Sequence, residues 1–181
     1  MNVKCACLTV FAVLSFSAQP VPALADPIES QSTAKQKVTR GEFYAALGRI
    51  QTAADKVLGL PVRSSGKPSE PDKAVTRKDV VIALHAQFAH FKPKFRVAPR
   101  PLPVVDKAMD RPENKSFRAE LETLVKWGFV GSVGPLVTGP GEDLNAEHIG
   151  DAIGYFYNQL TVLTHQADPK WTPRLQRTDG G

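Results

Sequence analysis

The chain has almost no cysteine. Its 181 residues include two, Cys5 and Cys7, and both lie within the first ten positions. The remaining sequence therefore has no thiol for a zinc finger, a redox Cys-x-x-Cys pair or a cysteine nucleophile. The composition is otherwise globular, with 42% hydrophobic and 23% charged residues, which excludes a disordered chain and a collagen-like chain.

Long apolar runs are also missing after the N-terminal segment. Residues 5–16 are almost uninterruptedly apolar, they follow Lys4, and they precede small residues in an Ala-x-Ala pattern at Ala23 and Ala25. This is the pattern of a secretory signal peptide that is cleaved after Ala25. The run is shorter than the roughly 20 residues that cross a bilayer, so we expect no stable membrane span after cleavage. The predicted location is extracytoplasmic: secreted, periplasmic or in the cell envelope.

The sequence predicts four parts along the chain. Residues 1–25 are the signal peptide, 26–36 a linker, 37–165 one helical domain and 166–181 a C-terminal tail. Removal of Lys4 with the signal peptide leaves 22 of the 23 basic residues against 18 acidic ones, a net charge of +4. A mildly basic extracytoplasmic chain is compatible with an acidic polymer or an anionic envelope as its partner. No base-reading motif indicates nucleic acid.

Three segments repeat one pattern. They open with Val38-Thr39-Arg40, Val75-Thr76-Arg77 and Leu144-Asn145-Ala146. The second residue of each is a good N-cap, because its side-chain oxygen can accept hydrogen bonds from the free N–H groups of a first helical turn. Glu42 and Asp79 stand where a capping box needs an acid, and His148 takes that place in the third segment.

The apolar residues of the three segments also recur at helical spacing. Positions five, eight and nine after the opening residue are apolar and share one helical face. The pattern predicts three amphipathic helices that end near Asp55, Phe91 and His165. The ninth position holds a residue that we expect to be buried in one shared core, namely Leu47, Leu84 and Ile153.

A fourth helix is predicted between Asp110 and Gly128, and the remaining segments are rich in proline and glycine. The composition therefore predicts three loops, at residues 61–73, 92–103 and 131–141, and the second of them should be extended. The predicted fold class is all-α: a small bundle of capped helices with Pro/Gly-rich loops. In the run Tyr155-Phe156-Tyr157, consecutive side chains point to different sides of a helix, so we expect Phe156 in the core.

The Val-Thr-Arg segments resemble the Thr-Arg-Ala-Glu motif of the S-layer homology (SLH) family. Residues 104–165 look like one whole SLH repeat, and 37–57 and 75–92 look like second helices of two degenerate repeats. The resemblance implies a helical module that binds a negatively charged cell-wall polysaccharide non-covalently, with the motif arginine in the ligand groove. That role would fall on Arg40 and Arg77, with the neighbouring Thr39 and Thr76 as further ligand-binding residues.

Two other interpretations of these arginines are open. They could be ordinary solvated charges in the first helical turn, or the chain could be a periplasmic scaffold or adaptor that contacts an envelope protein and no glycan. If Arg40 and Arg77 bind the ligand, replacing either with glutamate should weaken binding without loss of stability, because acids suit a helix N-terminus.

An enzyme is the least favoured class. The sequence has no facing carboxylate pair, no Gly-x-Ser-x-Gly motif and no phosphate loop. His148 and Asp151 are spaced to share a metal ion, but no third ligand lies near them in the sequence. We expect no catalytic residue, no metal site and no cofactor.

Overall fold

The structure is a computed structural model of the chain. It describes residues 37–63, 66–102, 104, 106–139, 144–165 and 175–177. The chain divides into residues 1–30 and a compact unit of residues 31–181. The predicted signal peptide and linker, and most of the predicted tail, lie outside the described residues.

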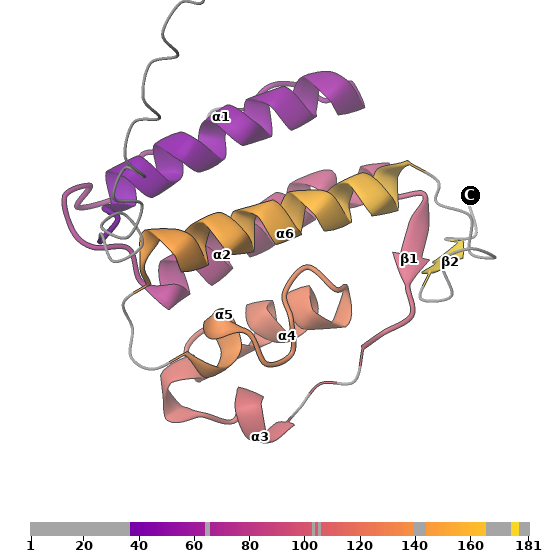
Figure 1. The fold of residues 1–181 in the computed structure, drawn as a ribbon. Helices are drawn as coiled ribbons and strands as arrows, with labels where there is room; N and C mark the ends of the chain where they lie inside the picture. Colours follow the sequence, from indigo (N-terminus) through magenta and orange to yellow (C-terminus); the bar gives the residue numbers. More distant parts are fainter. Residues whose placement is uncertain are drawn as a thin grey trace, which may run out of the picture. The chain divides into compact units, whose positions relative to one another are not determined.

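The described part of the chain is mostly helical, which confirms the all-α class (Figure 1). Its helices are α1 (Arg40–Leu58), α2 (Arg77–Phe91), α3 (Asp106–Met109), α4 (Arg118–Lys126), α5 (Pro135–Thr138) and α6 (Ala146–Thr164), with 3-10 turns at Lys92–Lys94 and Pro112–Asn114. None of the described helices is long and apolar enough to cross a membrane.

The prediction that residues 131–141 form only a loop is wrong, because the short helix α5 lies within them. One pair of short strands was also not predicted. Strand β1 (Val97–Pro99) lies in the proline-rich loop that the sequence predicts to be extended, and it pairs with β2 (Leu175–Arg177) of the tail. The pairing is antiparallel, with Val97 opposite Arg177. The extended loop thus gains its backbone partners from a segment nearly eighty residues further along the chain.

The three predicted N-caps are confirmed. The Thr39 hydroxyl accepts a hydrogen bond from the Glu42 amide (3.2 Å), and the Glu42 carboxylate accepts one from the Thr39 amide (2.9 Å). Thr76 and Asp79 form the same reciprocal pair in α2. In α6 the Asn145 side chain accepts a hydrogen bond from the His148 amide (2.8 Å). This cap differs from a capping box only in having no acidic side chain at position 148 to accept from the Asn145 amide.

The helix ends follow local signals as well. Gly59 closes α1 in the left-handed region at φ 61°, four residues beyond the predicted end near Asp55. The predicted end of α2 at Phe91 is confirmed. The fourth helix is shorter than expected: α4 begins at Arg118, because residues 112–114 form a 3-10 turn, and Gly128 at φ 72° follows its end.

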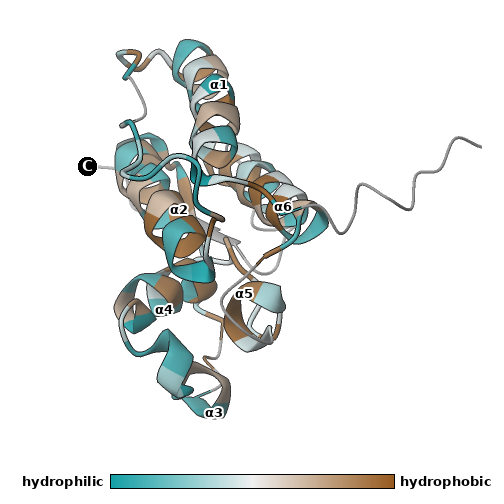
Figure 2. Ribbon diagram, turned by 90° about the vertical axis from the view of Figure 1, so that its left-hand side faces the viewer, coloured by the Kyte–Doolittle hydropathy of each residue, from teal (hydrophilic) through white to brown (hydrophobic). Residues whose placement is uncertain are grey.

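The hydrophobic core forms around α2, which packs against both α4 and α6. Leu47, Leu84 and Ile153 are all buried in it, as their shared repeat position predicts. Phe156 is fully buried, and its ring centroid lies 4.5 Å from that of Phe129. Figure 2 shows apolar and polar residues along α1 and α6, as the amphipathic pattern requires. Helix α2 is not the amphipathic helix that the pattern predicts: it packs between other helices and buries residues on most of its faces.

Helices α1 and α2 also meet through buried polar side chains. Gln87 donates a hydrogen bond to Gln51 (2.6 Å), and His90 Nε2 lies 2.6 Å from Asp55 Oδ1. Asp55 is fully buried, and its other carboxylate oxygen accepts from the Arg63 amide. The two pairs give these buried side chains hydrogen-bond partners where α1 meets α2.

Candidate functional site

The starts of the three capped helices lie together. Thr39, the N-cap of α1, forms a backbone bridge with Ala74 just before α2, and Lys37 forms one with Asn145, the N-cap of α6. The Val75 amide also donates to the Val38 carbonyl (2.9 Å). The segment before α1 therefore joins the other two helix starts, and the repeated residues are brought to one end of the bundle.

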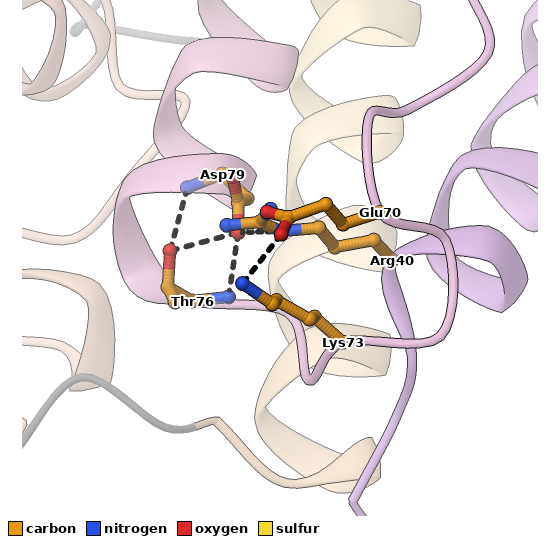
Figure 3. A network of polar contacts seen from close by, with 5 residues as sticks. All are labelled: Arg40, Glu70, Lys73, Thr76 and Asp79. Atoms are coloured by element: carbon orange, nitrogen blue, oxygen red, sulfur yellow. Dashed lines mark hydrogen bonds and ion pairs between the residues drawn. The ribbon is translucent and has the colours of Figure 1, made fainter.

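Arg40 is held by acids at the start of the next repeat (Figure 3). Its Nε donates to Asp79 Oδ2 (2.9 Å), and its NH1 donates to Glu70 Oε2 (3.3 Å). Glu70 also pairs with Lys73, whose Nζ lies 2.5 Å from Glu70 Oε1. The Arg40 side chain keeps 20% of its surface exposed, so this network lies at the rim of the molecule.

These contacts change the acidity of the two carboxyl groups. Partial burial alone would raise the pKa of Asp79, but hydrogen bonds from the Thr76 amide and hydroxyl and from Arg40 outweigh it and lower the pKa. Lys73, and secondarily Arg40, lower the pKa of Glu70. Both carboxyl groups are therefore charged at neutral pH and neutralise part of the positive charge of Arg40.

Arg77 occupies the same repeat position as Arg40 but is buried, with only 2% of its surface exposed. Its guanidinium donates to Asn114 Oδ1 (3.0 Å) and to the Gly139 carbonyl (3.3 Å), and lies over the Phe117 ring. Asn114 in turn donates to the carbonyls of Ala108 and Val137. Arg77 thus ties α2 to the 3-10 turn before α4 and to the segment after α5.

The two arginines follow one geometric rule. Each reaches from the first turn of its helix into the loop that leads to the next capped helix. Glu70 precedes the N-cap Thr76 by six residues, and Gly139 precedes the N-cap Asn145 by six. The third repeat has Ala146 at the arginine position, and its methyl side chain cannot make such a contact.

Both arginines line one small cavity of about 200 Å³. Its other lining residues are Thr76, Lys78, Glu113, Ser116 and Phe117. Three of the four predicted ligand-binding residues are therefore brought together, whereas Thr39 does not line this cavity and its hydroxyl is used by the capping box of α1.

Sequence reasoning missed three polar residues of this cavity. Lys78 follows Arg77 directly and is exposed, and it makes no ion pair with the part of the chain that the structure describes. Glu113 and Ser116 come from the segment before α4, which no local pattern places beside α2. Only the tertiary fold brings that segment to the start of the second repeat.

The structure corrects one expectation about these arginines. Glutamate at position 40 would face the carboxylates of Asp79 and Glu70, and glutamate at position 77 would bury an acid beside the Gly139 carbonyl. Either change places negative charge against acceptors, which the favourable helix dipole does not offset. Charge reversal at these positions is therefore destabilising rather than neutral.

A second cavity, of about 550 Å³, opens beside the first turns of α1. It is lined by the cations Arg49, Arg63 and Lys67, and no acidic residue is among its lining residues. All three cations are exposed and form no ion pair within the described ranges of the chain. The lining of this cavity is therefore cationic.

The described residues contain no group of three or more histidine, cysteine, aspartate or glutamate side chains that could hold a metal ion. Comparison of the chain with protein-family models, with curated proteins and with solved structures gives no match.

Proposed function

We propose that this chain is an extracytoplasmic, SLH-like module that binds an acidic cell-wall polysaccharide. The observation that carries the proposal is the cavity shared by Arg40 and Arg77, which stand at one repeat position and come from two different helices. The sequence resemblance predicts a ligand groove at this position.

The charge distribution supports an anionic ligand. Lys78 extends the positive lining of the shared cavity, and Gly41, the residue after Arg40, lines the neighbouring cationic cavity with Arg49. Exposed lysine and arginine side chains can contact carboxylate or phosphate groups of a polymer without first losing a protein partner. In this proposal Arg40 and Arg77 shape the cavity, and Lys78 and the exposed arginines attract the polymer.

Lys78→Glu is the variant that tests the proposal. Lys78 is exposed, has no ion pair among the described residues and stands in the first turn of α2, where an acid is favourable, so the variant should fold. The charge-matched control is Lys56→Glu in the last turn of α1, roughly 24 Å along the helix from Arg40 at 1.5 Å per residue. An acid at a helix C-terminus costs ~0.3–1 kcal/mol, so circular dichroism checks that both variants are folded.

Binding is measured by co-sedimentation with purified cell-wall sacculi, before and after extraction of their acidic polysaccharide. The parent and Lys56→Glu should sediment with the untreated sacculi, and Lys78→Glu should bind at least several-fold less. Added salt should weaken binding, since exposed charge contacts are screened beyond ~8–10 Å. Equal sedimentation of the parent, Lys56→Glu and Lys78→Glu with untreated sacculi would contradict the proposal.

The burial of Arg77 favours a second function, that of an envelope scaffold or adaptor with a protein partner. In this interpretation the repeated arginines only hold the helix starts together. Exposed apolar side chains on α1, Val57 at 76% and Ile50 at 37%, offer a surface for a partner protein. Sacculi stripped of polysaccharide but not of protein would then retain the chain.

A further inference from the structure

A third cavity, of about 620 Å³, lies between α6 and the segment that runs from the end of α4 through α5. Its volume falls within the range of roughly 300–1,000 Å³ that is typical of small-molecule sites. No lysine or arginine lines it, so it differs in chemistry from the two cationic cavities near α1.

One wall is a polar stripe along α6. His148, Asp151, Tyr155 and Asn158 follow each other at intervals of three or four residues, which places them on one face of the helix. Asp151, Tyr155 and Asn158 are exposed, and Tyr155 keeps 50% of its surface in solvent. None of the four side chains makes an ion pair or a hydrogen bond with the part of the chain that is described, so their polar groups are available.

The opposite wall is apolar, and two glycines lie beside the polar stripe of α6. Val130, Pro135 and Leu136 supply the apolar wall. Gly150 and Gly154 lie on the α6 side, and a Cβ atom added at either position would meet no atom within 4 Å. The two glycines therefore leave open a space next to the Tyr155 ring that larger residues would fill.

We propose that this cavity binds a neutral pyranose unit of a saccharide. A pyranose ring has an apolar C–H face and a rim of hydroxyl groups. The Tyr155 ring and the apolar wall match the face, whereas Asp151, Asn158 and His148 match the hydroxyl rim as hydrogen-bond acceptors and donors. The site needs no charge on the ligand, so it is independent of the acidic polymer proposed for the Arg40 cavity.

The test is a titration of the full chain, followed by ¹H–¹⁵N NMR, with two neutral probes: cellotriose and N,N′,N″-triacetylchitotriose. At least one should cause saturable shifts of the Asp151, Gly154, Tyr155 and Asn158 amides at concentrations up to ~10 mM, enough to saturate a site with a Kd of ~1 mM. Trigalacturonate serves as the acidic probe and indole as the apolar probe.

Three variants decide the assignment. Gly154→Leu places a large side chain, from a better helix former, in the open space beside α6 and should abolish the shifts. Tyr155→Ala should raise the Kd about tenfold through loss of the ring, whereas Tyr155→Phe keeps the ring and should change it less than about threefold. Val57→Ala, on the exposed face of α1, and Lys78→Glu should leave binding of the neutral probes unchanged.

The proposal is overturned if neither neutral probe shifts these amides, or if Gly154→Leu binds as well as the parent. It is also overturned if indole alone occupies the cavity, which would make it an apolar slot. Because cellotriose and triacetylchitotriose are uncharged, failure of this site leaves the Lys78→Glu sacculus comparison unaffected, and loss of sacculus binding in Lys78→Glu leaves the neutral-probe result unaffected.

Discussion

Arg40 and Arg77 form a matched pair, because the same residue stands at the same repeat position, with 20% of the side chain exposed at Arg40 and full burial at Arg77. We predict that Arg77→Met destabilises the fold strongly, whereas Arg40→Met does so weakly. Methionine keeps most of the apolar stem of arginine and removes the guanidinium, so the comparison isolates the polar contacts.

The magnitude follows from the partners of each guanidinium. Arg77 donates two charge-assisted hydrogen bonds, a buried one to Asn114 and a part-buried one to the Gly139 carbonyl. At ~1.5 kcal/mol each, at the lower end for bonds to charged groups, their loss costs about 3 kcal/mol. Arg40 makes two ion pairs, one with Glu70, which is about half exposed, and one with Asp79, which is 20% exposed. Exposed pairs contribute ~0–1 kcal/mol each, so about 1 kcal/mol is expected for the two together.

Urea and thermal unfolding, followed by circular dichroism, measure both values. The Arg77 variant should lower Tm by roughly 6–12 °C, and the Arg40 variant by no more than about 4 °C. Should both variants lie within ~1 kcal/mol of the parent, Arg77 would not be the structural tie inferred here. Arg77 would then again be a candidate ligand-binding residue, as Arg40 is.

Three further predictions follow from the fold. Leu84→Ala should cost about 2–5 kcal/mol in urea unfolding, because Leu84 is fully buried at the centre of the core; a cost below ~1 kcal/mol would contradict that packing. Hydrogen bonds from Thr39 lower the pKa of Glu42, and Thr76 and Arg40 lower that of Asp79, so both groups stabilise the fold above their unfolded pKa values near 4. This stability is lost as the pH falls through the lowered pKa values, and Asp79→Asn should flatten the decrease in urea midpoint between pH 5 and pH 2; an unchanged pH dependence would contradict the assignment. Finally, the mature protein should begin at Asp26, and N-terminal sequencing that finds mostly intact Met1 would refute the predicted cleavage.

The helix starts could be predicted because their causes are local. The Thr39 hydroxyl, like the Thr76 hydroxyl, reaches an amide three residues away, so the capping residues themselves decide where the helix begins. The spacing of Leu47, Leu84 and Ile153 likewise decides which face of each helix is apolar, whatever element lies against it.

Polar partners across the fold could not be predicted in this way. Gln51 and Asp55 look like solvent-facing residues of α1, and only the approach of α2 buries them against Gln87 and His90. Their separation of 35 to 36 residues leaves no periodic pattern in the sequence. The same holds for the pairing of β1 with β2, since neither segment shows a strand pattern of its own.

The two repeated arginines show most clearly how far the sequence can predict the environment of a side chain. The sequence by itself determined that Arg40 and Arg77 both follow an N-cap and stand in the first turn of a helix. Only the tertiary structure decided that Arg40 meets acids at the rim while Arg77 meets Asn114 and a backbone carbonyl in the interior. The physical reason is that burial depends on which distant loop covers a helix start, and that loop is chosen by the packing of the whole bundle.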